Sequence, residues 1–264
     1  MLGLEEEFYN PAKHMLLEKK KLLGAWLQIA SPFAAEIFAK AGVDVLMIDM
    51  EHGPNNILSL IDQLRAMGRF KGVPLVRAPW NDMVTIKRIL DAGAYGVLVP
   101  YVNTKKEAEE AVAACKYPLQ GVRGVAPSPR APGWNMNSMN YMYHANDETL
   151  VMIAIETLDA VNNIDQILEV EGLDGIFIGP MDLATSMGHF CDPSHPDVQA
   201  AIHKVEEVVL QSPKFLASVA GSMEVAKEKY DRGYSLVVAF ADGGTLGAAA
   251  QNKVETFQKM FPER

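Results

Sequence analysis

Short apolar segments that alternate with helical patterns are the feature that most constrains the fold of this chain. Eight segments rich in Val, Ile and Leu occur at residues 23–29, 44–49, 74–77, 96–99, 150–156, 175–178, 214–219 and 236–241. Near-continuous apolar runs of this length are typical of strands buried on both faces of a parallel sheet. The chain is therefore predicted to build its core around parallel strands.

Helical patterns separate most of these segments. Helices are predicted at residues 57–64, 83–90, 105–116, 159–170, 196–210, 223–232 and 246–261. Asn55 or Asn56 would cap the first, Asp82 precedes the second, and Gly93 would end it. Alternating strands and helices imply parallel strands with right-handed crossovers. Eight such units predict an α/β fold, a (β/α)8 TIM barrel, with a doubly wound open sheet as the alternative.

Length and composition agree with one barrel. The 264 residues divide into an N-terminal extension, 1–22, and a single barrel domain, 23–264, and 49% of them are apolar, enough to fill a core. A formal charge of −9 argues against binding to nucleic acid or anionic membranes. With two cysteines, no apolar run of membrane-spanning length and no signal-peptide pattern, the expected location is the cytoplasm.

One segment, residues 126–140, departs from the alternation. Its three prolines, its glycine and its asparagines cannot continue a regular helix. It is either an irregular surface connection or a functional flap or subunit contact.

Ionisable residues gather where four predicted strands end. They are Asp49, Glu51 and His52 after the second strand, Arg77 after the third, Glu156 after the fifth and Asp182 after the sixth. The carboxyl ends of barrel strands share one face, where active sites lie. Because isolated buried charges are costly, such a group indicates a functional site.

Glu156 and Asp182 are candidate metal ligands. They follow consecutive strands, so their carboxylates can converge. Carboxylates without nearby Cys or paired His suit a hard cation such as Mg²⁺ or Mn²⁺, with water or substrate completing the shell. The structural alternative is that each residue caps the helix that follows it. The other strand-end groups favour the metal.

Arg77 and His52 supply a fixed cation and a proton carrier. Arg77 can bind a carboxylate or stabilise an oxyanion, and its structural alternative is an ion pair that braces the barrel rim. His52 is the natural acid–base group, and Asp49 could accept a hydrogen bond from its ring. No second His is placed to make this a zinc motif.

Two further features carry weaker signals. Asp91 stands near the end of a predicted helix, where a negative charge opposes the helix dipole. It is either solvated or compensated by a partner, within the chain or across a subunit interface. Gly243 and Gly244 precede a predicted helix and could offer N–H groups to an anion, but they match neither a Walker A motif nor a dinucleotide-binding fingerprint.

Taken together, the motifs resemble those of the HpcH/HpaI aldolase family, the metal-dependent class II pyruvate aldolases. The resemblance rests on GAW at 24–26, IDMEHGPN at 48–55, VRAPWND at 76–82, GVRGV at 121–125, IET at 155–157 and FIGPMDL at 177–183. These motifs stand in the family's order and span about residues 23–261. The segment before residue 23 lies outside the resemblance.

The resemblance implies a barrel whose last helix is exchanged with a neighbour, commonly in a hexamer built as a dimer of trimers. It implies a divalent metal (Mg²⁺, Mn²⁺ or Co²⁺) on Glu156 and Asp182, no nucleotide and no Schiff-base lysine. His52, supported by Asp49, would be the acid–base residue. A small 2-oxo acid and an aldehyde would be the partners, and aromatic-compound catabolism the setting.

The same resemblance implies how substrate would bind. Arg77 would contact the keto oxygen of a 2-oxo acid, and the backbone of Gly179, Met181 and Asp182 would hold its carboxylate. Trp26 would line the pocket. Asp91 would approach a neighbouring subunit's site.

The expected reaction is reversible cleavage of a 4-hydroxy-2-oxo acid to pyruvate and an aldehyde. His52, acting through a water, would take the proton from the C4 hydroxyl, and Arg77 and the metal would stabilise the enolate charge. Members of the family often have Gln where this chain has Ala154, and Ala where it has Met181. Both departures would alter the pocket and the aldehyde preference.

Two alternatives stay open. The same site could decarboxylate oxaloacetate or cleave an acyl-CoA thioester, as citrate-lyase-like relatives do, although the sequence has no evident basic groove for coenzyme A. The other alternative is an inactive barrel retained as a binding or assembly protein.

Overall fold

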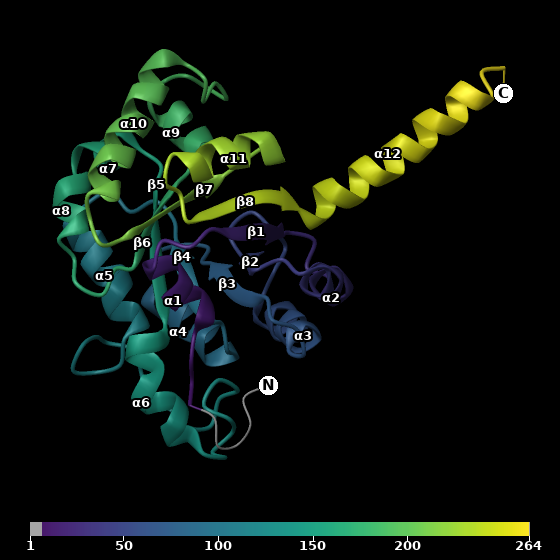
Figure 1. Ribbon diagram of the computed structural model, residues 1–264. Coiled ribbons are helices and arrows are strands. Elements are labelled where there is room, and N and C mark those ends of the chain that lie inside the picture. The colour runs from purple at the N-terminus through teal and green to yellow at the C-terminus, as the bar shows by residue number, and fades with distance from the viewer. Residues whose placement is uncertain (1–6, 264) are drawn as a thin grey trace.

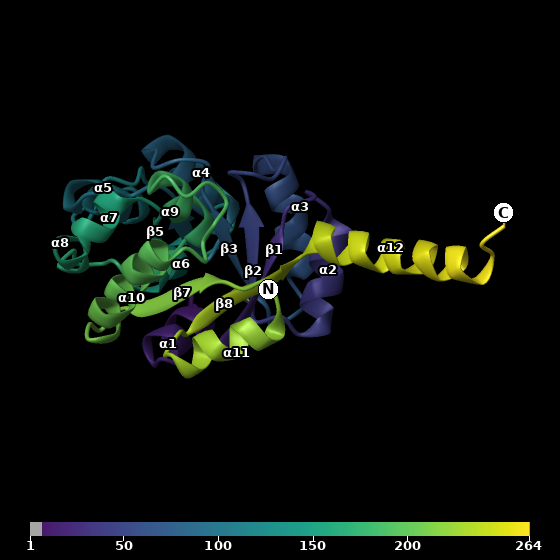
Figure 2. The same cartoon turned by 90° about the horizontal axis from the view of Figure 1, so that it is seen from above.

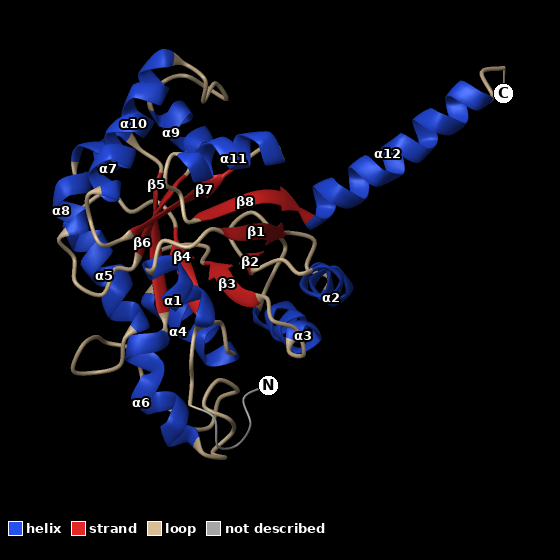
Figure 3. Ribbon diagram, in the orientation of Figure 1, coloured by secondary structure: helices blue, strands red, loops and turns tan. Residues whose placement is uncertain are grey.

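The computed structural model describes residues 7–263 of the chain, and its centre is a closed barrel of parallel strands in sequence order, β1 to β8 (Figures 1 and 3). The strands are β1 Leu22–Leu27, β2 Val45–Asp49, β3 Val73–Arg77, β4 Gly96–Val99, β5 Leu150–Ile155, β6 Gly175–Ile178, β7 Phe215–Val219 and β8 Leu236–Ala241. Because β1 pairs with β8, the barrel prediction is confirmed and the open sheet is excluded.

Helices follow most strands, and most of them cover the barrel from outside (Figure 3). They are α1 Pro11–Leu17, α2 Pro32–Ala41, α3 Ile57–Met67, α4 Met83–Ala92, α5 Lys105–Cys115, α6 Ser138–Glu148, α7 Leu158–Asn162, α8 Ile164–Leu168, α9 Pro180–Ser186, α10 Pro196–Leu210, α11 Met223–Asp231 and α12 Asp242–Met260. Among the described residues, none of these helices is long and apolar enough to cross a membrane.

The helix predictions were incomplete at identifiable places. The helix predicted at 159–170 is two short helices, because Asn163 leaves helical geometry (φ −98°, ψ 5°) and its side-chain amide donates to the Asn103 carbonyl. Sequence reasoning missed α1, α2 and α6. The signals for α2 were present, since Ser31 caps it and Gly42 ends it with φ +95°. The predicted irregular segment, 126–140, becomes helical at Ser138.

Strand alternation sorts the apolar residues into two cores. In β2, Val45 and Met47 point into the barrel, whereas Leu46 and Ile48 pack against the surrounding helices. The same period of two holds in β5. The interior core therefore contains every second strand residue, and the last interior position of each strand lies at the carboxyl-terminal mouth.

Helix α1, from the expected N-terminal extension, closes the opposite mouth of the barrel. Ala12 and Leu16 are buried with the interior core. Lys13 on the same helix lies 3.1 Å from Asp174 and donates to the Thr149 carbonyl. Closure of this mouth contributes to stability rather than to chemistry, because barrel active sites lie at the other mouth.

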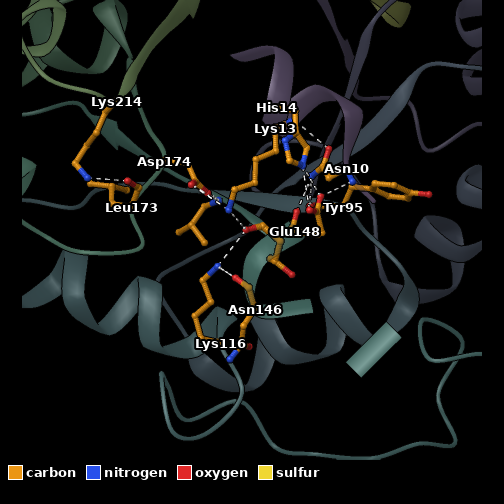
Figure 4. Close-up of polar contacts among 12 residues, drawn as sticks. Asn10, Lys13, His14, Tyr95, Lys116, Asn146, Glu148, Leu173, Asp174 and Lys214 are labelled. Carbon is orange, nitrogen blue, oxygen red and sulfur yellow. Dashed lines mark hydrogen bonds and ion pairs between the residues drawn. The ribbon is translucent and has the colours of Figure 1, made fainter. Parts of the chain in front are cut away.

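Three buried lysines stand at this base (Figure 4). Lys214 donates to the Val170 and Leu173 carbonyls, and Lys116 donates to those of Asn146 and Thr149. Burial, followed by repulsion from nearby Lys13, lowers the pKa of Lys116 from 10.5 to about 8. The Lys116 amine is therefore harder to protonate in the folded chain than in the unfolded one.

This shift predicts a pH dependence of stability. Between about pH 8 and 10.5 the unfolded chain keeps a proton on Lys116 that the folded chain releases, so the Lys116 contribution to the free energy of unfolding rises with pH across that window, by about 3 kcal/mol. Urea unfolding of the wild type and of Lys116→Met at several pH values checks this. The difference between the two proteins should change in favour of the wild type as pH rises, and a constant difference would contradict the prediction.

Helix α12 leaves the barrel at the end of β8 and projects away from it (Figures 1 and 2). It is anchored at its start by buried Asp242, whose carboxylate accepts the N–H groups of Gln28 and Ile29. The same carboxylate accepts the N–H of Gly243, so that donor already has a partner within the chain. The rest of α12 is exposed.

Candidate active site at the carboxyl-terminal mouth

The site is built from the last interior positions of the strands. Asp49 continues the inward series of Val45 and Met47 in β2, Arg77 ends β3 in the same way, and Glu156 directly follows β5 in the inward series of that strand. All three charged side chains are buried. The strand period thus explains why charges that follow apolar runs point into the barrel rather than out to solvent.

Asp49 and Arg77 are register partners on neighbouring strands and form a two-pronged ion pair. Arg77 Nε donates to Asp49 Oδ1 at 2.9 Å and Nη2 to Oδ2 at 2.6 Å. Gln28 adds a 2.8 Å hydrogen bond to Oδ2. Burial raises the pKa of the Asp49 carboxyl, but the bonds from Arg77 and Gln28 outweigh it and hold the pKa below its ordinary value. Asp49 is therefore a fixed anion that aims the guanidinium.

The predicted hydrogen bond from the His52 ring to Asp49 is absent from the structure, so this prediction is wrong. Asp49 Oδ1 accepts the backbone N–H groups of Glu51 and His52, at 3.1 and 3.2 Å, and the imidazole is not its partner. The ring lies instead with Nε2 3.7 Å from Glu51 Oε2, and 61% of the side chain is exposed. The reason is position: Asp49 ends a strand inside the barrel, whereas His52 belongs to the loop that begins there.

The Glu51 carboxylate lies between Arg77 and His52 at this mouth. Its Oε2 lies 3.1 Å from Arg77 Nη1, yet it has no hydrogen-bond partner among the described residues. Burial is the largest cause of the raised pKa of Glu51, and the charges of Asp49 and Asp182 add to it, whereas Arg77 and His52 oppose it. A buried carboxylate oxygen without a full partner is a group that a cation or a substrate proton would satisfy.

Glu156 is held in a close-fitting place. Its Oε2 accepts the N–H of Tyr101 at 3.0 Å, and a Cβ on Gly179 would come within 2.7 Å of its carboxylate. Only glycine fits at that position for this reason. The pKa of Glu156 is raised to about 7: burial is the largest cause, the Tyr101 bond opposes it, and the charges of Glu51 and Asp182 add to the rise.

Neither Glu156 nor Asp182 is a helix cap, so the structural alternative for both is wrong. Thr157 caps α7 through its own hydroxyl, which accepts the Ala160 N–H. Gly179 occupies the N-cap position of α9, and Asp182 lies in the first turn. Helix capping therefore does not explain why carboxylates stand at these two positions.

The electrostatics of the mouth fit a bound cation. Glu51, Glu156 and Asp182 each raise the pKa of another member or of Tyr101, which places all three carboxylates within electrostatic reach of one another. Arg77 is committed to Asp49 and Glu51. Oxygen ligands with uncompensated negative charge are the donor set that Mg²⁺ or Mn²⁺ prefers.

Aromatic side chains border the charged groups. The Arg77 guanidinium lies over the Trp26 ring, 4.3 Å from its centroid, so Trp26 supports the arginine from within the barrel. Trp80 and Tyr101 stack with centroids 5.9 Å apart and are both partly exposed. Burial, followed by the charge of Asp182, raises the pKa of the Tyr101 phenol. The stacked pair forms an apolar edge beside the carboxylates.

Asp91 has a partner within the chain. Arg123, which is fully buried, donates from Nη2 to Asp91 Oδ1 at 2.8 Å and offsets the charge at the end of α4. The irregular segment packs there too, because Arg130 donates to the Ala92 carbonyl and the Ala131 N–H to the Asp91 carbonyl. The approach of Asp91 to a neighbouring subunit stays a prediction.

Sequence reasoning gave no role to Gln28, Glu51 or Tyr101. Gln28 and Tyr101 stand just beyond β1 and β4, so the strand-end rule would have found them. It was not applied there because neither residue carries a charge at neutral pH. Glu51 was noted at its strand end, but its contact with Arg77 depends on loop geometry that spacing does not reveal.

The chain is similar in sequence and in structure to known proteins of one family. The family model described as HpcH/HpaI aldolase/citrate lyase matches residues 22–246. The 4-hydroxy-2-oxo-heptane-1,7-dioate aldolase of Escherichia coli is 41% identical over 243 residues, which cover 92% of each chain. A solved HpcH/HpaI aldolase/citrate lyase family protein from Burkholderia cenocepacia J2315 is similar with a TM-score of 0.91 and 34% identity, over 94% of this chain and 99% of that one. An HpcH/HpaI aldolase from Desulfitobacterium hafniense DCB-2 gives 0.86 and 28%, over 93% and 96%.

Proposed function

Because the chain belongs to the HpcH/HpaI aldolase/citrate lyase family, we propose that the carboxyl-terminal mouth of its barrel is the site where a 4-hydroxy-2-oxo acid is cleaved to pyruvate and an aldehyde. The enzyme is a carbon–carbon lyase, a class II pyruvate aldolase. The observation that carries the site assignment is the convergence of Glu51, Glu156 and Asp182 beside a guanidinium held by Asp49.

Glu156 and Asp182 would hold the divalent cation. Their fit is supported by the buried Glu156 carboxylate, by the charge of Asp182, which contributes to the raised pKa of Glu156, and by the Glu51 oxygen that lacks a hydrogen-bond partner among the described residues. When bound, the cation supplies Lewis-acid stabilisation of negative charge on the 2-oxo oxygen. Mg²⁺, Mn²⁺ and Co²⁺ are all compatible with this donor set.

Arg77 would bind the keto oxygen of the substrate. Its Nε and Nη2 are held by Asp49 and its face by Trp26, so the guanidinium needs no reorganisation when charge develops. The substrate carboxylate would meet the backbone of Gly179, Met181 and Asp182 at the first turn of α9, where no side chain provides a cap.

His52 would move the protons. Its exposed imidazole beside Glu51 is suited to take the C4 hydroxyl proton through a water, after which the C3–C4 bond breaks and the aldehyde leaves. Return of a proton to C3 of the enolate gives pyruvate. The part that Asp49 plays is to position Arg77 and the loop backbone, rather than to orient the imidazole.

The aldehyde side of the substrate is set by the residues around this core. Ala154 is buried at an interior position of β5, and Met181 is exposed at the start of α9. The E. coli relative is named for 4-hydroxy-2-oxo-heptane-1,7-dioate, whose cleavage between C3 and C4 yields pyruvate and succinic semialdehyde. We propose this dioate as the first substrate to test, in a pathway of aromatic-compound catabolism.

The test is aldol addition with metal-loaded protein, pyruvate and a panel of aldehydes that includes succinic semialdehyde and glycolaldehyde. We expect a 4-hydroxy-2-oxo acid from at least one aldehyde, loss of the product in EDTA, and recovery when Mg²⁺ or Mn²⁺ is restored. Turnover undiminished in EDTA would contradict the metal assignment. Release of CO₂ from oxaloacetate without any aldol product would identify a decarboxylase, and the absence of both metal binding and pyruvate proton exchange would indicate an inactive barrel.

We also propose that α12 packs on a neighbouring subunit, in a hexamer built as a dimer of trimers. Leu246, Ala250, Val254, Phe257 and Phe261 follow one another at helical spacing and are exposed. An apolar stripe of this kind on a projecting helix requires a partner surface.

A receiving surface exists on the barrel itself. Helices α2 and α11 follow the two strands that flank β8, and they expose Phe33, Ile37, Met223 and Val225. These are the helices against which a helix after β8 would pack if it folded back. Exchange of α12 between two copies would cover both surfaces at once.

Phe257→Asp should therefore lower the molar mass of the assembly. The change places a charge in the middle of the apolar stripe, and light scattering after gel filtration measures the mass. Asn252→Asp is the matched control, because it adds the same charge on the opposite side of α12, and it should assemble normally. An unchanged mass for Phe257→Asp would refute helix exchange.

A further inference from the structure

The loop after β4 holds the Glu156 carboxylate through its backbone. The Tyr101 N–H donates to Glu156 Oε2 at 3.0 Å, whereas Oε1 is the oxygen that a Cβ on Gly179 would meet at 2.7 Å. Gly179 is the N-cap of α9, and Asp182 follows in the first turn of that helix. One oxygen of Glu156 is therefore tied to the loop, and the other lies beside the start of the helix that carries Asp182.

Tyr101 makes this hydrogen bond from an unfavourable backbone conformation. Its φ is +55°, in the left-handed region that a bulky side chain rarely adopts. Such a conformation persists only where neighbouring contacts enforce it, and it is found preferentially at active sites. The contacts that fix Tyr101 are therefore the contacts that aim its N–H at Glu156.

Asn103 supplies such contacts with its side chain. Its Nδ2 donates to the carbonyl of Tyr101 at 3.1 Å, so it binds the residue whose N–H holds Glu156. Its Oδ1 accepts the hydroxyl of Thr157, the residue that directly follows Glu156. One side-chain amide thus links the loop after β4 to the chain just beyond β5, and both of its partners adjoin Glu156, one in space and one in sequence.

Asn103 is itself fixed by two helical regions. Its backbone N–H donates to Glu107 Oε2 at 2.7 Å, and its carbonyl accepts from the Asn163 amide at 2.8 Å. Glu107 lies in α5, and Asn163 lies between α7 and α8. Because the backbone of Asn103 is held on both sides, its side chain can keep Tyr101 and Thr157 in place.

We propose that Asn103 is a positioning residue for the Glu156 carboxylate, which it orients for a cation by holding the left-handed Tyr101 and the Thr157 hydroxyl. The inference rests on the proposed role of Glu156 as a metal ligand. A ligating carboxylate binds an ion more tightly when its orientation is fixed beforehand, and the hydrogen-bond partners that fix it contribute about ten- to a hundredfold in affinity.

Asn103→Leu tests the proposal, because it removes both side-chain hydrogen bonds and keeps a similar volume. We expect Mn²⁺ to bind about tenfold or more weakly, measured by electron paramagnetic resonance titration of the metal-free chain without substrate. Since Asn103 acts on metal affinity, kcat should return to near the wild-type value at saturating Mn²⁺. The urea midpoint should fall as well, because hydrogen bonds of the fold are lost.

Asn146→Leu is the matched control for stability. Asn146 also makes two side-chain hydrogen bonds, both with the backbone of Tyr117, next to Lys116 at the base of the barrel. Asn146→Leu should therefore lower the urea midpoint as Asn103→Leu does, but it should bind Mn²⁺ with the affinity of the wild type.

Thr157 gives a second pair of variants that does not depend on the folding of Asn103→Leu. Thr157→Ser keeps the hydroxyl that donates to Asn103 and caps α7, so it should bind Mn²⁺ as the wild type does. Thr157→Ala loses that hydroxyl and should bind Mn²⁺ more weakly.

The outcomes separate this inference from the function on which it rests. Unchanged Mn²⁺ affinity in both Asn103→Leu and Thr157→Ala would overturn the positioning role and leave the metal site standing. Equal weakening in Asn146→Leu would also overturn it, because lost stability would then explain the effect. If the wild type bound no Mn²⁺ at all, the proposed metal site would fail and the role of Asn103 would fail with it.

Discussion

Glu156→Gln should remove catalysis while leaving the fold intact. The amide keeps an acceptor for the Tyr101 N–H and almost the same shape beside Gly179, but it takes away the charge that would bind the divalent ion. We expect kcat to fall by about a hundred- to a thousandfold or more and binding of Mn²⁺ to be lost. Steady-state kinetics and Mn²⁺ titration measure the two effects.

The Glu156→Gln change should also affect the stability of the metal-free protein. Burial raises the pKa of Glu156 to about 7, so its charged form is costly in the fold. At pH 8 the Glu156→Gln chain should therefore unfold at the same temperature as the metal-free wild type or at a higher one. A drop in melting temperature would mean that Glu156 serves the fold instead.

Glu206→Gln is the matched control for Glu156→Gln. Glu206 is similarly buried, but its carboxylate accepts a hydrogen bond from Tyr234 and pairs with Arg232, neither of which belongs to the proposed active site. Burial raises its pKa, and the bonds from Arg232 and Tyr234 lower it by more, so the net shift is downward. This variant should lose stability and keep its turnover, the reverse of what is expected at Glu156.

Asp49→Asn should damage both stability and turnover. The amide cannot accept two charged hydrogen bonds from Arg77, so the guanidinium loses its counter-charge and its orientation in a buried place. Breaking such a pair costs about 3 kcal/mol of unfolding free energy, and misplacing an oxyanion-binding group costs about a hundredfold in kcat. Urea unfolding and kinetics check both values.

Metal binding separates this role of Asp49 from that of a ligand. Asn at position 49 should leave Mn²⁺ affinity near that of the wild type, because Asp49 is already committed to Arg77 and Gln28. Gln28→Leu removes one supporting bond only and should cost about 1 kcal/mol, with a smaller loss of kcat. If Asp49→Asn instead abolished Mn²⁺ binding, the carboxylate would have to be reassigned as a ligand.

Several parts of the fold and site could be predicted from local pattern. Near-continuous apolar runs predict the strands, and three strand boundaries, 96–99, 175–178 and 236–241, agree with those in the structure. Three site residues were recognisable because each places a charge at the end of an apolar run, where burial is costly unless the charge has a partner or a function. They are Asp49, Arg77 and Glu156. The split of the helix predicted at 159–170 was not recognisable, because it depends on Asn163 reaching Asn103 across the surface.

The sequence by itself determined the alternation that closes into a barrel, the mouth at which the charges gather, and the chemistry of the groups there. Only the tertiary structure decided which of those groups contact one another. Asp49 binds Arg77 rather than the His52 ring, Glu51 joins the site, and α12 stands away from its own barrel. The physical reason is that hydrophobic patterns depend on residues that are neighbours along the chain. The partner of a charged side chain depends instead on distance in space, between strands and loops whose separation the sequence does not reveal.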